Sequence, residues 1–120
     1  MINELKPNQI FCFGSNAQGA HGAGAAKQAH DNHWTKWGHS KGLMWQSFAI
    51  DTMDGKDVFE TGLKDLAITA RCNPSLEFLL TPVGTGIAGY TIEQLEAMMP
   101  EMPSNVIKLW EVTNTLKEEE

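Results

Sequence analysis

Two glycine-rich segments contain the residues with the clearest chemical potential. Residues 13–26 read FGSNAQGAHGAGAA, and residues 82–90 read PVGTGIAGY. Glycine lets a backbone adopt positive φ and lie close to a ligand. Where such a loop joins a strand to a helix, its free N–H groups point towards an anion. Two such loops in a short chain predict one pocket that contacts phosphate from two sides, and therefore a phosphorylated small molecule such as a nucleotide.

Neither loop matches a known phosphate-binding motif. The Gly-Lys-Ser/Thr ending of a P-loop is absent, and so is the GxGxxG pattern of a dinucleotide site. The acidic residue expected after the second strand of such a site matches Asp51 only loosely. Each loop taken alone is equally compatible with a tight strand-to-helix turn. Their occurrence at equivalent strand ends favours a binding site.

Alternating strands and helices are predicted to position these loops. We expect strands over 9–13, 47–50, 76–81 and 105–109, and helices over 24–36, 58–71 and from Thr91 onward, where Gln94 completes a capping box. This order predicts an α/β fold with a parallel or mostly parallel mixed sheet and helices on its faces. Ligands of such sheets bind beyond the carboxyl ends of the strands, so both glycine loops are expected to border one crevice.

Composition limits the partners. The chain has 120 residues, 42% of them hydrophobic, which predicts one domain over 1–120 with flexible ends at 1–8 and 114–120. A net charge of −6 without a basic cluster argues against a broad nucleic-acid surface or an anionic membrane surface. Neither a signal peptide nor a membrane span is evident. Cys12 and Cys72 lack metal-ligand spacing, which favours a reduced cytoplasmic setting.

Four histidines, at positions 21, 30, 33 and 39, raise the possibility of a metal site. His30 and His33 are three residues apart on an expected helix, but no cysteine or glutamate completes a ligand set, so we expect no metal. His21 differs because it lies inside the first glycine loop. There it can donate a hydrogen bond to a phosphate or polarise a water molecule.

Three tryptophans, Trp34, Trp37 and Trp45, cluster between the first expected helix and the second expected strand. A packing cluster over one sheet edge is the simplest interpretation. An adenine-stacking wall and a subunit interface remain open alternatives, and the latter corresponds to a homodimer.

Three segments together resemble a small macrodomain-like family of phages and bacteria. These segments are FGSNAQGAHGAGAAKQA, QSFAIDT and FLLTPVGTGIAGYT, and the matching stretches cover most of the chain between Ile10 and Ile107. They are also similar to the macrodomain branch that includes the terminal ADP-ribose protein glycohydrolases. The resemblance implies a single three-layer domain with helices on both faces of its sheet. It also implies binding of ADP-ribose, of a related NAD-derived nucleotide, or of an ADP-ribosylated macromolecule.

The resemblance assigns roles residue by residue. Residues 22–24 match the loop that wraps the distal ribose and diphosphate, and residues 84–88 match the second phosphate loop. Thr85 would add a hydroxyl, and Tyr90 would lie at the rim against a ribose or base, or else be a half-buried core tyrosine. The implied ligand-binding residues are Gly14, Ser15, Asn16, Gly19, His21, Gly22, Ala23, Gly24, Thr52, Gly84, Thr85, Gly86, Ile87, Ala88, Gly89 and Tyr90.

The chain departs from the family pattern where the glycohydrolase branch performs chemistry. That branch has a lysine and an aspartate at the positions of Met53 and Ala88. We therefore expect a binding module, without a required cofactor, that recognises or sequesters its ligand in the cytoplasm of a bacterium or of a phage-infected host. One alternative is a hydrolase of ADP-ribosyl or O-acyl bonds, with Asn16, His21 and Asp51 placing water. Another is an interaction module without a ligand.

Overall fold

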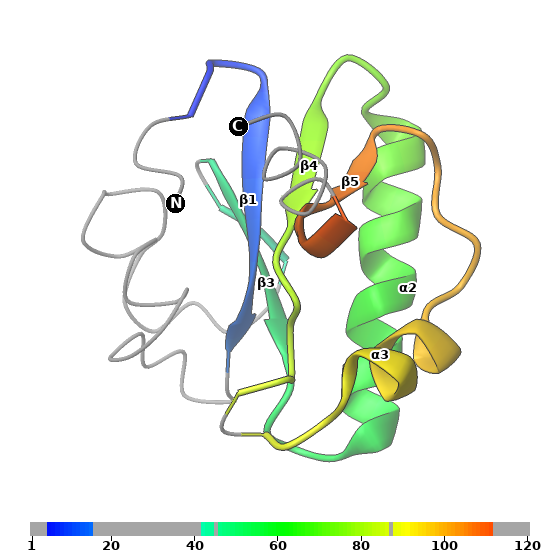
Figure 1. Cartoon of the computed structure of the whole chain (residues 1–120). Helices are drawn as coiled ribbons and strands as arrows, with labels where there is room; N and C mark the ends of the chain where they lie inside the picture. Colours follow the sequence, from blue (N-terminus) through cyan, green and yellow to red (C-terminus); the bar gives the residue numbers. More distant parts are fainter. Residues whose placement is uncertain (1–4, 16–41, 45, 87, 112–120) are drawn as a thin grey trace.

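The computed structural model describes residues 5–15, 42–44, 46–86 and 88–111, which form a five-stranded sheet and two helices (Figure 1). The elements are β1 (Gln9–Ser15), β2 (Gly42–Met44), β3 (Ser47–Asp51), α2 (Lys56–Cys72), β4 (Glu77–Leu80), α3 (Ile92–Met98) and β5 (Val106–Lys108). The strand order is β2-β3-β1-β4-β5. Strand β2 is antiparallel to β3, and the other neighbouring pairs are parallel. The predicted α/β class and mostly parallel mixed sheet are thus confirmed.

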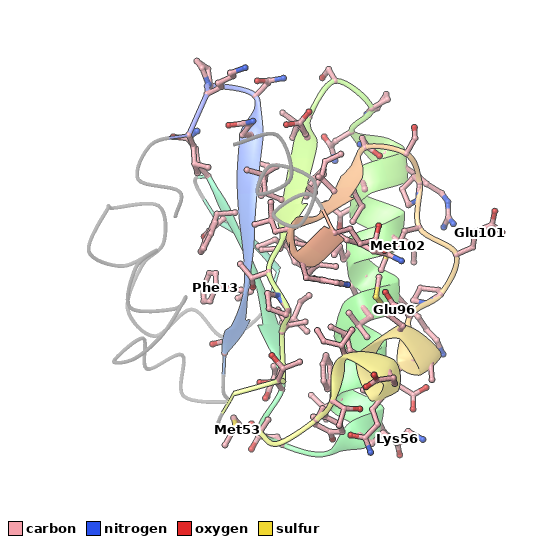
Figure 2. The ribbon with its side chains drawn as sticks, viewed as in Figure 1. Phe13, Met53, Lys56, Glu96, Glu101 and Met102 are labelled. Carbon is pink, nitrogen blue, oxygen red and sulfur yellow. The ribbon has the colours of Figure 1, made fainter. Side chains whose placement is uncertain are left out.

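The central strands each contain a continuous apolar run, over residues 10–13 in β1, 48–50 in β3 and 78–80 in β4, because both of their faces are buried. In the register of the sheet, Cys12 lies beside Phe48 and Leu80, and these side chains belong to the core shared with the helices. The alternate residues occupy the opposite face. There Phe11 and Phe13 are also buried, and Figure 2 shows Phe13 pointing away from α2.

Helix α2 packs closely against β3. The helix expected over 58–71 is confirmed, and Leu63, Leu66 and Ala70, which are spaced three or four residues apart, are fully buried on one side of it. Gly62 allows the close approach, because a Cβ there would lie 2.9 Å from Cγ2 of Ile50. The helix begins two residues earlier than expected, after Gly55, whose φ of 108° few other residues adopt.

Helix α3 begins with the predicted capping box. The Thr91 hydroxyl accepts a hydrogen bond from the Gln94 amide at 3.0 Å, and Oε1 of Gln94 accepts one from the Thr91 amide at 2.8 Å. Leu95 and Met98 join the same core cluster as α2, so both helices cover one face of the sheet (Figure 1). The helix expected over 24–36, and with it the expectation of helices on both faces, lies outside the described residues.

Strand boundaries shift by one or two residues, and β2 was not expected. Strand β1 continues two residues past its predicted end because Ser15 pairs with Asp51 of β3. Strand β2 has three residues and depends on antiparallel pairing with β3. Among the described residues, no helix is both long and apolar enough to cross a membrane.

Candidate functional site

The carboxyl ends of three neighbouring strands meet at one edge of the sheet. A Cβ built on Gly14, in β1, would lie 3.3 Å from Oγ1 of Thr52, after β3, and 3.7 Å from the backbone nitrogen of Gly84, after β4. The Thr52 amide also donates to the carbonyl of Ser15 at 3.1 Å. The loops after β1, β3 and β4 therefore start in contact with one another, as the topology of a parallel sheet predicts.

The second glycine loop, residues 82–90, is closed by its own hydrogen bonds. The Tyr90 amide donates to the carbonyl of Gly84 at 2.9 Å, and the Gly89 amide donates to the carbonyl of Gly86 at 3.0 Å. The amides of Gly84, Gly86 and Ala88 donate no hydrogen bond to any residue that the structure describes. With respect to the described residues, these three N–H groups are available to an acceptor, and phosphate oxygens are acceptors that such amides bind.

The glycines of this loop differ in backbone conformation and in the space around them. Gly84 and Gly89 have φ of 79° and 82°, in the region that other residues rarely adopt. Gly84 is also crowded, because a Cβ there would lie 2.4 Å from Cε2 of Phe59. Gly86 has neither constraint: its φ is not positive, and a Cβ there would meet nothing within 4 Å. The described residues therefore give no structural reason for glycine at position 86, whereas close approach of a ligand would be one.

Two other loop side chains take part in local structure. The Thr85 hydroxyl donates to the carbonyl of Pro82 at 2.7 Å, so its proton is engaged inside the loop, and a phosphate oxygen would need a donor. The half-buried Tyr90 ring packs edge-on against Phe59, with ring centroids 5.1 Å apart and an interplanar angle of 73°. This contact agrees with the interpretation of Tyr90 as a half-buried core tyrosine, and its role at the rim stays a prediction.

Asp51, one of the expected water-placing groups, is buried at the end of β3. Its Oδ1 accepts a hydrogen bond from the Met53 amide at 3.0 Å. Burial raises the pKa of the Asp51 carboxyl, and the neighbouring carboxylate of Asp54 raises it further. Asp51 lines a pocket of about 220 Å³ between β3 and α2, together with Asp57 and Thr61. No described residue of the second glycine loop lines this pocket.

Met53 and Ala88, which the resemblance aligns with a lysine and an aspartate, both follow strands at the carboxyl edge. Met53 follows β3 and is 47% exposed, with no group that could form a covalent bond to a sugar (Figure 2). Ala88 is half-buried in the second glycine loop. Lys56 lies in the first turn of α2, with its Nζ 3.8 Å from Oε1 of Glu60.

The two cysteines differ in exposure to solvent, and neither belongs to a metal-binding group among the described residues. Cys12 is buried in β1, and burial raises the pKa of its thiol, which keeps it protonated. Cys72 is exposed at the last residue of α2. Among residues 5–15, 42–44, 46–86 and 88–111, no group of three or more His, Cys, Asp or Glu side chains could hold a metal ion.

Most of the first glycine loop lies outside the described residues. Only its first members, Gly14 and Ser15, are placed, at the end of β1. The roles of the remaining residues stay predictions: Asn16, Gly19, His21, Gly22, Ala23, Gly24 and Ile87 of the implied site, together with His30, His33, His39, Trp34, Trp37 and Trp45.

Sequence reasoning missed Phe59. The residue lies four positions before Leu63, a spacing that puts it on the same side of α2, and it is fully buried. Its contacts with Gly84 and Tyr90 join α2 to a loop about 25 residues later in the chain, and no local pattern indicates that pairing.

Comparisons of the chain with models of protein families, with curated proteins and with solved structures gave no match. The likeness to the macrodomain-like family therefore stays a prediction from the quoted motifs. The site is interpreted from its own geometry.

Proposed function

We propose that this protein binds ADP-ribose, or a related NAD-derived nucleotide, with the diphosphate held by the loop over residues 82–90. The observation that carries the proposal is the combination at Gly86, a glycine whose identity no described residue explains, in a loop where the amides of Gly84, Gly86 and Ala88 lack partners among the described residues. Backbone amides bind diphosphate without cationic side chains, which suits a chain of net charge −6.

The first glycine loop supports the proposal through its starting point. Gly14, near the end of β1, lies close to Thr52 and to the Gly84 nitrogen. The segment that follows β1 therefore starts beside the loop over 82–90. The resemblance assigns the distal ribose to that segment. The ligand is then either the free nucleotide or an ADP-ribosyl group on a macromolecule, which the protein recognises or sequesters.

Binding is favoured over catalysis because Met53 and Ala88 replace the reactive pair of the glycohydrolase branch. The second candidate function is hydrolysis of an ADP-ribosyl or O-acyl bond. It is favoured by the raised pKa of the buried Asp51 carboxyl, because a carboxyl whose pKa is raised by burial holds a proton more readily and is a candidate general acid or base. Release of ADP-ribose from a modified protein, abolished by Asp51→Asn, would establish the second candidate.

Titration calorimetry with ADP-ribose tests the proposal. We expect wild-type protein to bind ADP-ribose more tightly than AMP, which lacks the diphosphate. Gly86→Val should weaken ADP-ribose binding about tenfold or more, because its branched side chain occupies the space a ligand needs, while thermal stability stays within about 0.5 kcal/mol of wild type.

The matched control is Gly55→Ala, outside the loop. It replaces a glycine of positive φ and should lower stability without changing ADP-ribose affinity. Absence of binding to wild-type protein at millimolar ADP-ribose would overturn the proposal. Unchanged affinity in Gly86→Val would overturn the assignment of the diphosphate to this loop.

A further inference from the structure

An aromatic ring from α2, that of Phe59, packs directly beneath the second glycine loop. Phe59 is fully buried, and its Cε2 and Cζ atoms lie 2.4 and 2.7 Å from the position that a Cβ on Gly84 would occupy. These distances are shorter than any real contact with a Cβ, so the ring occupies the space of the missing side chain. The backbone of Gly84 therefore rests directly on Phe59.

The same ring also contacts the other end of the loop. Tyr90 packs edge-on against Phe59, and its Cδ2 lies 3.3 Å from the Cβ position of Gly84. The Tyr90 amide donates to the Gly84 carbonyl at 2.9 Å, which joins the two ends. Phe59 thus supports both residues that close the loop, and the amides of Gly86 and Ala88 lie between them in the chain.

We propose that Phe59 is the positioning residue of the diphosphate loop: its ring holds Gly84 and Tyr90 at the spacing that orients the amides of Gly84, Gly86 and Ala88 towards one anion. The inference rests on the proposed function for the identity of the ligand. The packing of Phe59 against Gly84 and Tyr90 is observed whatever the ligand is. An amide site binds tightly only when its donors are held in place before the ligand arrives, and rigid packing beneath the loop provides that order.

Phe78 provides a matched comparison. It is the same residue type, is fully buried, and belongs to the same core cluster, but it lies near the start of β4. It is not among the nearest neighbours of any described glycine in the loop. Replacing either phenylalanine by leucine removes a similar volume from one core. Only the Phe59 variant removes the aromatic ring that contacts Gly84 and Tyr90.

The experiment compares Phe59→Leu with Phe78→Leu in the full chain. Urea unfolding gives the stability of each variant, calorimetry under fully folded conditions gives its ADP-ribose affinity, and ¹H–¹⁵N spectra report the loop amides. Both variants should lose similar stability. Only Phe59→Leu should lower the affinity, by about tenfold, and only it should shift the amide signals of Gly84, Gly86 and Ala88 in the free protein.

A merely structural role predicts equal effects of the two variants on stability and none on affinity. Equal affinities, or equal losses of affinity, would overturn the inference. If wild-type protein does not bind ADP-ribose, the proposed function fails, and the amide spectra alone decide: shifts confined to Phe59→Leu support the positioning role, and unshifted loop amides overturn it. If Phe59→Leu does not fold, Phe59→Met, which has a flexible side chain of similar volume, takes its place.

Discussion

The amino and carboxyl edges of the sheet differ in whether their backbone polar groups have hydrogen-bond partners among the described residues. At the amino edge, side-chain amides cover them: Nε2 of Gln46 donates to the carbonyls of Lys6 and Gln9, and Nδ2 of Asn105 donates to three further carbonyls. At the carboxyl edge, the loop over 82–90 contains small residues and has alternate amides without a partner among the described residues.

The difference separates structural groups from candidate functional groups. Backbone groups in a folded protein are normally satisfied, so a row of unused donors needs either water or a ligand. The amino edge contributes to stability because its side chains tie strands to connecting segments. The carboxyl edge has amides without a partner among the described residues, and under the proposed function its glycines let an anion approach them. Four variants test whether the two edges are separable in this way, starting with the largest expected effect.

Gly84→Ala should break the carboxyl edge. The added Cβ meets Phe59 and requires a positive φ, so we expect a loss of about 3 kcal/mol or more in the free energy of unfolding, measured by urea denaturation. Gly89→Ala, which has the strained φ but open space, should cost about 1 kcal/mol. Equal losses in the two variants would show that Phe59 does not constrain Gly84.

Asn105→Ala should damage the amino edge alone. Its side chain donates to the carbonyls of Ala70, Asn73 and Leu76 at 2.9, 3.2 and 3.0 Å. Removing these three bonds should cost about 2 kcal/mol, measured by thermal unfolding, although the carbonyls of Ala70 and Asn73 each keep a backbone donor. Asn73→Ala, which removes one side-chain bond to Thr69, is the smaller matched change. A change in ADP-ribose affinity in Asn105→Ala would contradict the separation of the edges.

Asp51→Asn should reveal the cost of a buried charge at the carboxyl edge. Because the pKa of Asp51 is raised in the folded state, its contribution to stability is full below about pH 4 and falls as pH rises through the folded pKa. Unfolding measured between pH 3 and 7 should therefore favour Asp51→Asn over wild type increasingly towards neutral pH.

Asp51→Ala separates the charge from the hydrogen bond. It also removes the acceptor of the Met53 amide, so it should lie about 1 kcal/mol below Asp51→Asn at every pH, with the same slope. A stability difference between wild type and Asp51→Asn that does not vary with pH would show that the carboxyl does not titrate differently in the folded protein.

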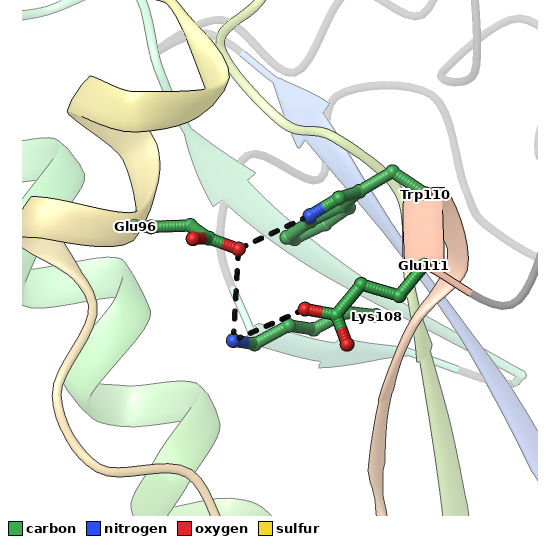
Figure 3. Close-up of polar contacts among 4 residues, drawn as sticks. All are labelled: Glu96, Lys108, Trp110 and Glu111. Carbon is green, nitrogen blue, oxygen red and sulfur yellow. Dashed lines mark hydrogen bonds and ion pairs between the residues drawn. The ribbon is translucent and has the colours of Figure 1, made fainter. Parts of the chain in front are cut away.

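Lys108→Met should have the smallest effect. Nζ of Lys108, at the end of β5, lies 3.8 Å from Oε1 of both Glu96 and Glu111, and Oε1 of Glu96 also accepts from Nε1 of Trp110 at 3.3 Å (Figure 3). These groups are partly exposed, so urea unfolding should show a loss under about 0.5 kcal/mol that disappears in high salt. Lys56→Met removes a comparable exposed pair. A loss well above about 0.5 kcal/mol that high salt removes would show that these ion pairs stabilise the protein more than expected, and a loss that does not depend on salt would show that the Lys108 side chain acts through packing.

Local patterns predicted the elements that bury one face. The stripe containing Leu63, Leu66 and Ala70 identified α2, and Thr91 with Gln94 identified the start of α3, because these signals depend on spacings of three or four residues. Strand β2 escaped prediction because three residues have no periodicity and acquire strand geometry only by pairing with β3. The candidate site was predicted in part, since strand order alone brought the residues after β1, β3 and β4 together.

By itself, the sequence determined the alternation of strands and helices and the two glycine-rich loops, because both follow from residue types and short spacings. Only the tertiary structure showed which glycines are constrained by packing and which are not. Gly84 is required because Phe59, from a distant helix, occupies its side-chain space, whereas Gly86 faces no such constraint. Only packing between segments distant in the chain distinguishes a glycine that the fold demands from one that a ligand would use.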